Sequence, residues 1–216
     1  MTEGLRKEGD EVNPKRVGRR MRVMGLKAIY PKPRWSRGAV EPRKYPYLLG
    51  DLTVERSHQA WCTDITYIRL HRGFVCLLAV MDGFSRYVPS WRVSTSMDTG
   101  FCLEALNEAL EGGRPEIFNS DQGGQFTSRE FTGRLEEIGI RISRDGRGRV
   151  FDNIFIERLW RSVKYEEVYL KDYTRVSEWG ESLRGYFRFY NEERLHQALE
   201  YRTPQMVYRI GHRLTA

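Results

Sequence analysis

The chain has 216 residues, of which 40% are hydrophobic and 12% aromatic, a composition typical of a globular protein rather than a disordered one. Its net charge of +7 is concentrated at one end, because residues 1–50 hold thirteen Lys and Arg against five Asp and Glu, a net of +8. No stretch is apolar for long enough to form a signal peptide or a membrane span, so we expect a cytoplasmic protein that makes no membrane contact.

Residues 13–25 contain the signals of one short basic helix. Asn13 is placed to cap it, Pro14 suits its first turn, and Gly25 ends it. The side chains that we expect to contact DNA phosphates from this helix are Arg16, Arg19 and Arg20. The alternative is a basic tail that is merely solvated.

Four prolines between residues 31 and 50 predict an extended linker. From Asp51 the pattern becomes that of a folded domain. Residues 60–68 alternate as a strand does, and residues 74–82 form a run that is apolar up to its last residue, Asp82, as in a strand buried on both faces. Residues 86–93 also predict a strand, which Pro89 places at an edge of the sheet.

Helical and strand patterns alternate in the rest of the chain. Predicted helices cover residues 98–110, 128–139, 152–167, 177–190 and 204–210, and predicted strands cover residues 116–121 and 140–143. This order indicates an α/β fold in which helices flank a mixed sheet. The three cysteines, Cys62, Cys76 and Cys102, are widely spaced in apolar segments, which favours buried thiols over disulfides or a zinc site.

Three acidic residues lie where a carboxylate is unexpected. Asp64 is in the middle of a strand whose other residues are uncharged, and burying it there is costly unless it is paired or binds a cation. Asp121 ends a short strand before the glycine-containing turn QGGQF. Glu157 is on a helix beside the apolar face, together with Arg161 and Lys164. For Glu157 alone, an exposed ion pair with Arg161 is the alternative interpretation.

The segments WCTDITYI, NSDQGGQF and DNIFIERLWRSVKYE resemble the catalytic motifs of the DDE transposases of the insertion-sequence 3 family, which are related to retroviral integrases. Asp121 and Glu157 are separated by 35 residues, the spacing of that family's D,D(35)E signature, and Lys164 follows the glutamate by seven residues. The closing segment FYNEERLHQALEYRTPQMVY is similar to that of the family, and PKRVGRRMRVMGLKA resembles part of a helix-turn-helix.

This resemblance implies an RNase H-like core with a five-stranded mixed sheet, flanked by helices and preceded by a small basic helical segment. Asp64, Asp121 and Glu157 would bind two Mg²⁺ or Mn²⁺ ions during cleavage and strand transfer of DNA. The domains expected are a partial helix-turn-helix over residues 1–30, the linker over 31–50, and the catalytic core with its C-terminal helical extension over 51–216.

The expected partners are double-stranded DNA, as element ends and as target, further copies of the chain assembled on that DNA, and an upstream-frame transposase protein. The protein would then be associated with the bacterial nucleoid. Lys164, and Arg161 on the same stripe, would contact the DNA end. Charge and glycine content add Arg147 and Arg149, in the loop 144–149, as candidate phosphate contacts.

Two alternatives to an active transposase remain open at this point. One is a truncated DNA-binding remnant without catalytic activity, suggested by the short N-terminal segment. The other is an RNase H-like nuclease that acts on RNA·DNA hybrids, which the position of Lys164 and the basic segment disfavour.

Overall fold

The computed structural model describes Gly9 and residues 11–24, 45–50, 52–69, 73–144, 154–171, 173 and 176–213. The chain divides into two units, residues 1–41 and residues 42–216. In the first unit, the predicted basic helix is present as α2 (Pro14–Val23). The Asn13 side chain caps it by accepting a hydrogen bond of 2.9 Å from the Lys15 N–H. The expected cap therefore starts this helix.

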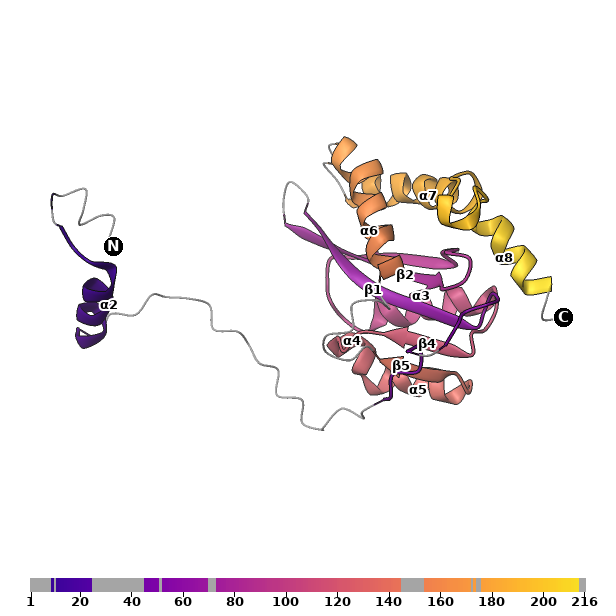
Figure 1. The fold of residues 1–216 in the computed structure, drawn as a ribbon, viewed down its shortest axis with the longest axis horizontal. Helices are drawn as coiled ribbons and strands as arrows, with labels where there is room; N and C mark the ends of the chain where they lie inside the picture. Colours follow the sequence, from indigo (N-terminus) through magenta and orange to yellow (C-terminus); the bar gives the residue numbers. More distant parts are fainter. Residues whose placement is uncertain are drawn as a thin grey trace. The chain divides into compact units, whose positions relative to one another are not determined.

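The second unit is built on a five-stranded sheet in the order β3-β2-β1-β4-β5 (Figure 1). The strands are β1 (Ala60–Arg69), β2 (Phe74–Asp82), β3 (Ser90–Ser94), β4 (Ile117–Ser120) and β5 (Arg141–Arg144). β1, β2 and β3 pair antiparallel, whereas β4 is parallel to both β1 and β5. The mixed sheet expected from the sequence is confirmed, and β3 is the edge strand that Pro89 predicted.

Helices cover both faces of this sheet. They are α3 (Gly100–Glu111), α4 (Gly124–Thr127), α5 (Arg129–Glu137), α6 (Ile154–Glu166), α7 (Val176–Glu192) and α8 (Pro204–Arg213), with 3₁₀ turns η1 (Val168–Leu170) and η2 (Gln197–Leu199). α6 and α7 pack on one face, and α3 and α5 pack on the other. Within the described residues, no helix has the length and apolar character needed to cross a membrane.

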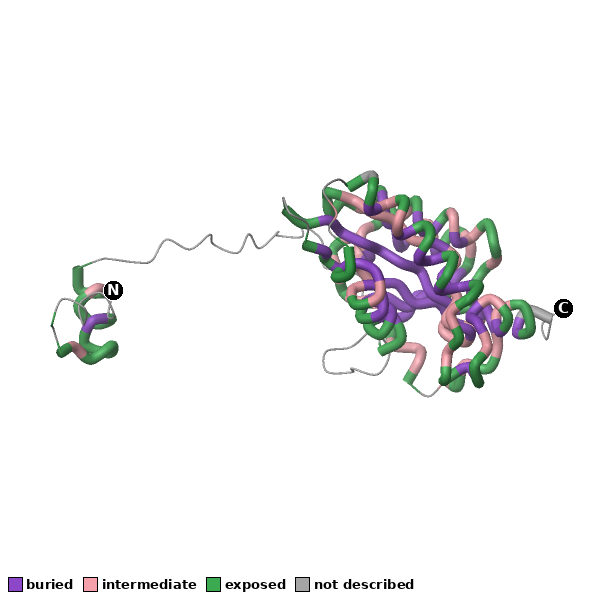
Figure 2. Tube along the Cα trace, turned by 90° about the horizontal axis from the view of Figure 1, so that it is seen from above, coloured by how far each residue is buried: buried purple, intermediate pink, exposed green. Residues whose placement is uncertain are grey.

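The contacts of β2 explain why this strand is apolar from Val75 to Met81. Leu77, Ala79 and Met81 contact the core under α6 and α7, whereas Leu78 and Val80 contact the core under α3 and α5. Figure 2 shows the strands as buried, with exposed residues on the outer surfaces of the helices. A strand covered on both faces has no solvent-facing position that a polar residue could occupy.

The end of the predicted linker belongs to the second unit. The Arg144 N–H donates to the Pro46 carbonyl at 3.2 Å, and the Leu48 N–H donates to the Ser143 hydroxyl at 3.0 Å. Residues 46–48 therefore lie along the outer edge of β5. The division between the two units falls at residue 41 rather than at residue 50.

Two local expectations were wrong. Arg144, which the sequence placed in the arginine-rich loop, ends β5 and is buried, with its guanidinium donating to the Phe126 carbonyl at 3.2 Å. The QGGQF turn is partly helical, because α4 forms there and buries Phe126 against the Phe131 ring. Arg147 and Arg149 lie outside the described residues. All three cysteines are buried thiols outside any disulfide, as predicted.

Candidate active site

The pairing of β1 with β4 brings the first two acidic residues together. In the parallel register, Cys62 is opposite Asn119. Continuing this register by two residues places Asp64 opposite Asp121, on neighbouring chain segments and on the same face. Neighbouring strands lie about 4.8 Å apart, so the two carboxylates are within electrostatic reach of each other. Two residues that are 57 positions apart in the chain are thus brought to neighbouring positions, Asp64 within β1 and Asp121 directly after β4.

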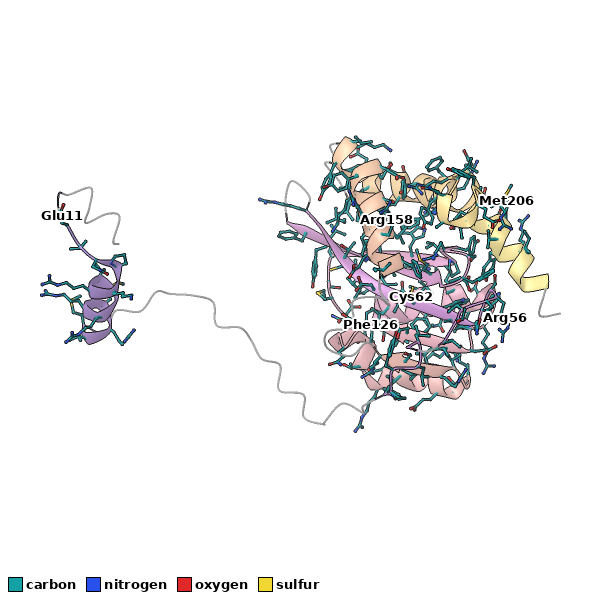
Figure 3. The ribbon with its side chains drawn as sticks, in the orientation of Figure 1. Glu11, Arg56, Cys62, Phe126, Arg158 and Met206 are labelled. Carbon is teal, nitrogen blue, oxygen red and sulfur yellow. The ribbon has the colours of Figure 1, made fainter. Side chains whose placement is uncertain are left out.

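Asp64 lies beneath α6, which supplies a direct contact to it. The indole N–H of Trp160 donates a hydrogen bond of 2.9 Å to Oδ2 of Asp64. Figure 3 marks the two elements involved by Cys62 on β1 and Arg158 on α6. The Trp160 side chain is itself only 5% exposed, so its ring is fixed by the core on which α6 packs. The contact holds Oδ2 of the Asp64 carboxylate in a fixed direction.

The charge state of Asp64 reports on its surroundings. The pKa of the Asp64 carboxyl is raised from 3.8 to about 6, mainly by burial and to a smaller extent by the nearby carboxylates of Asp121 and Glu157, while the hydrogen bonds from Trp160 and the backbone act in the opposite direction. Negative charges therefore converge on a half-buried acid. A bound cation would reverse this unfavourable interaction.

Asp121 and Glu157 are positioned by different local structures. Asp121 follows β4 directly, and its Oδ1 accepts a hydrogen bond of 2.9 Å from the Gly123 N–H, which fixes the carboxylate at the end of the strand. Glu157 lies in the first turn of α6 and is exposed. It precedes Trp160 by three residues, so the two side chains lie on neighbouring parts of the helix surface.

The donor set suits a divalent cation in its chemistry, because Mg²⁺ prefers carboxylate oxygens and retains several of its waters. In the described part of the chain, no three His, Cys, Asp or Glu side chains are yet close enough together to hold a metal ion. Two of the acids are fixed by the sheet, whereas Glu157 is on a helix surface. The three acids therefore fit a divalent cation by their residue type and by their negative charge.

A cavity of about 480 Å³ lies on the same side of β1, but its lining includes Cys62, Arg86 and Phe155 and none of the three carboxylates. This cavity is therefore not the site of the three acids.

The predicted basic contacts are distributed over both units. Arg161 is exposed and Lys164 half-buried on α6, on the side of the helix that carries Glu157. The Arg161 guanidinium lies 5.9 Å from the centre of the Tyr165 ring, rather than in the alternative ion pair with Glu157. In the first unit, Arg16, Arg19 and Arg20 are all exposed on α2.

Trp160 is the residue of this site that the sequence did not reveal. Its position in the apolar pattern of α6 explains it fully as a core residue, and its contact with Asp64 spans 96 positions. Asp82 is a further buried acid, but it does not belong to the site. It accepts hydrogen bonds from the backbone N–H groups of His58 and Ser85. Asp82 is therefore satisfied by the fold.

Comparison with known proteins shows the family of the chain. Residues 54–149 match one Integrase core domain family, and residues 138–204 match a second family of the same description. The transposase for insertion sequence element IS629 of Shigella sonnei is 32% identical over 207 residues, covering 93% of this chain and 69% of the relative. The chain belongs to the insertion-sequence transposases with an integrase core domain. The transposase is thus an enzyme of the DDE type.

Other relatives of the transposase lead to the same family. InsF, the transposase of insertion sequence IS3A in Escherichia coli K12, is 31% identical over 172 residues, covering 77% of this chain and 60% of that relative. The transposase of IS904 from Lactococcus lactis is 28% identical, and the match covers 95% of this chain and 84% of that relative. The resemblance to the insertion-sequence 3 family is confirmed.

Solved structures establish the fold independently. The catalytic core domain of HTLV-2 integrase, solved in complex with magnesium, superposes with a TM-score of 0.59 at 20% identity, covering 71% of this chain and 97% of that one. The catalytic core of BIV integrase gives a TM-score of 0.60 at 16% identity, covering 73% and 98%. The RNase H-like fold expected for the transposase is confirmed.

Proposed function

We propose that Asp64, Asp121 and Glu157 are the catalytic carboxylates of this transposase, and that they bind the divalent ions with which it cuts and joins DNA. The observation that carries the proposal is the parallel pairing of β1 with β4, whose register brings Asp64 near Asp121, the residue that directly follows β4, beneath the helix that supplies Glu157. The raised pKa of Asp64, to about 6, supports it, because ionised acids gathered in this way favour a cation as their partner.

Two Mg²⁺ ions, exchangeable for Mn²⁺, fit the three acids best. Such ions activate a water or hydroxyl for attack and stabilise the leaving oxygen of a phosphodiester. The chain's own part is to orient the ligands. Trp160 fixes one oxygen of Asp64, and the Gly123 N–H fixes one oxygen of Asp121. The magnesium named for the viral integrase core is consistent with this choice.

The substrate proposed is double-stranded DNA, both the ends of the mobile element and the target. A water molecule would attack first and a DNA 3′-hydroxyl second, so that cleavage and strand transfer use one site. Lys164 and Arg161 are suited to contact the backbone of the DNA end, since both lie beside Glu157. Arg16, Arg19 and Arg20 on α2 would contact other phosphates of the DNA. Arg147 and Arg149 remain predictions from the sequence.

We further propose that several copies act together on the DNA, because two element ends must be joined to one target. An upstream-frame protein is the proposed partner for recognising the end sequence. Co-expression with and without that open reading frame tests this part, with cleavage at the correct end as the measurement.

The central experiment uses full-length protein, labelled element-end DNA and Mg²⁺. Asp64→Asn and Glu157→Gln are expected to abolish nicked and joined products while DNA binding persists. Glu130→Gln is the matched control, because Glu130 is also an exposed glutamate in the first turn of a helix, α5. Equal activity of the wild type and the two site variants would exclude these residues as the catalytic acids. Degradation of an RNA·DNA hybrid without joining of DNA would favour the nuclease alternative.

A further inference from the structure

A ridge of exposed side chains leads away from Glu157 along α6. Glu157, Arg161 and Tyr165 follow one another at intervals of four residues, so they are neighbours on the helix surface. The ridge continues into η1, where the Tyr169 ring meets the Tyr165 ring edge-on, with centroids 5.3 Å apart and an interplanar angle of 84°. With the Arg161 guanidinium beside Tyr165, cation and rings form one continuous surface.

The two tyrosines are not used by the fold. Tyr165 is 63% exposed and Tyr169 65% exposed, and Leu170 next to them is 73% exposed. By contrast, Val163 on the opposite side of the same helix is fully buried. Single exposed apolar residues are common, but two contacting aromatic rings beside a cation form a patch that suits a ligand.

The charges around the rings favour a polyanion. Arg158 and Arg161 are exposed on α6, and Lys164 is half-buried there. The acids of the same stretch are directed elsewhere. Glu166 is paired with Arg194 at 2.6 Å, and Glu167 is buried and bonded to Lys171 at 2.8 Å. The ridge beyond Glu157 therefore presents positive charge and aromatic rings to the solvent.

Aromatic rings interleaved with cations bind unpaired nucleotides, because each base can stack on a ring while the backbone phosphates contact the cations. Intact duplex DNA does not offer the faces of its bases for stacking in this way. Eight residues of helix from Glu157 to Tyr165 span about 12 Å. At about 3.4 Å per stacked nucleotide, this distance corresponds to three or four nucleotides.

We propose that Tyr165 and Tyr169 form a stacking platform for unpaired bases of the DNA strand whose phosphodiester lies at the carboxylates, about three or four nucleotides from that phosphate. The inference rests on the proposed function, since the carboxylates define where the strand begins. The transposase would thereby hold a frayed DNA end open next to the site of reaction.

The test measures the fluorescence of 2-aminopurine, which is quenched when the base stacks on an aromatic ring. The probes are element-end duplexes with mismatched, and therefore frayed, termini that carry 2-aminopurine at the third or fourth nucleotide from the reacting phosphate. They are titrated with full-length protein in the presence of EDTA, so that no cleavage is needed. Fully paired duplexes of the same sequence serve as the comparison.

Tyr165→Leu combined with Tyr169→Leu removes the rings and keeps apolar side chains. We expect this variant to lose the quenching and to bind frayed DNA about tenfold or more weakly, with little change for the paired duplex. Tyr165→Phe with Tyr169→Phe should retain both properties. Tyr201→Leu is the matched control, because Tyr201 is 67% exposed in a different part of the unit.

Quenching that persists in the leucine variant would overturn the inference, as would an equal loss of affinity for frayed and paired DNA. A change in oligomeric state with unchanged DNA binding, measured by light scattering, would assign the rings to contacts between copies and would also overturn it. If the wild-type protein cuts DNA but does not quench the probe, the stacking platform is refuted and the proposed function stands. Quenching without any cutting supports the platform and counts against the proposed function.

Discussion

The substitution Asp64→Asn should make the fold more stable while removing its activity. Burial raises the pKa of Asp64 from 3.8 to about 6. The folded chain thus binds this proton more tightly than the unfolded chain does, and the contribution of Asp64 to stability falls as pH rises from about 4 to about 6. The full difference corresponds to about 3 kcal/mol above that range, as an upper limit.

Asparagine cannot ionise, so the variant does not lose stability as the pH rises through this range. Its amide oxygen can still accept the hydrogen bond from Trp160, which keeps the substitution local. After allowance for the partial exposure of Asp64, we expect the variant to exceed the wild type by about 1–3 kcal/mol in unfolding free energy at about pH 8, and by almost nothing at about pH 4.

Urea unfolding of both full-length proteins at a series of pH values in EDTA measures this difference. Addition of Mg²⁺ at about pH 8 should then stabilise the wild type more than the variant, because binding to the folded state alone raises its stability. A difference between the proteins that does not vary with pH would refute the reasoning, since it would show that the charge of Asp64 is not what destabilises the fold.

Three further substitutions test individual contacts. Trp160→Phe removes the N–H that orients Asp64, and it should lower the rate of DNA cleavage about tenfold, the effect of about 1.4 kcal/mol, while DNA affinity measured by gel shift is unchanged. Gly113→Ala should lower the melting temperature sharply, because its Cβ would lie 2.0 Å from the His58 ring and its φ of +153° is unfavourable for alanine; the expected cost is about 2 kcal/mol or more. Ser128→Ala removes the cap of α5 and should cost about 1 kcal/mol in urea unfolding. An unchanged rate of DNA cleavage would contradict the prediction for Trp160→Phe. An unchanged melting temperature would contradict that for Gly113→Ala, and an unchanged urea midpoint that for Ser128→Ala.

The elements of the catalytic unit were predictable because their patterns are local. The unbroken apolar run of β2 required cover on both faces, and Pro89 marked the edge of the sheet. Strand β3 begins at Ser90, directly after that proline, rather than at residue 86. The helix α6 has the register expected from its apolar residues.

Contacts between distant residues could not be predicted from such patterns. Periodicity places Trp160 on the inner face of α6, but it does not reveal that the indole reaches Asp64. The charge of Arg144 suggested a surface loop, whereas the pairing of β5 buries it. For the acids, spacing and resemblance indicated which residues belong together, and the parallel register of β1 and β4 supplied the geometry for two of them.

The segment along β5 has a practical consequence for isolating the catalytic unit. β5 is the last strand of the sheet, and residues 46–48 occupy its outer edge. A fragment that starts at Asp51 would strip this cover from the strand. The Arg144 N–H would lose its acceptor, and the exposed edge could pair with the same edge of another molecule. Such a fragment would be prone to aggregate, whereas one that starts at Pro42 would retain its own protection.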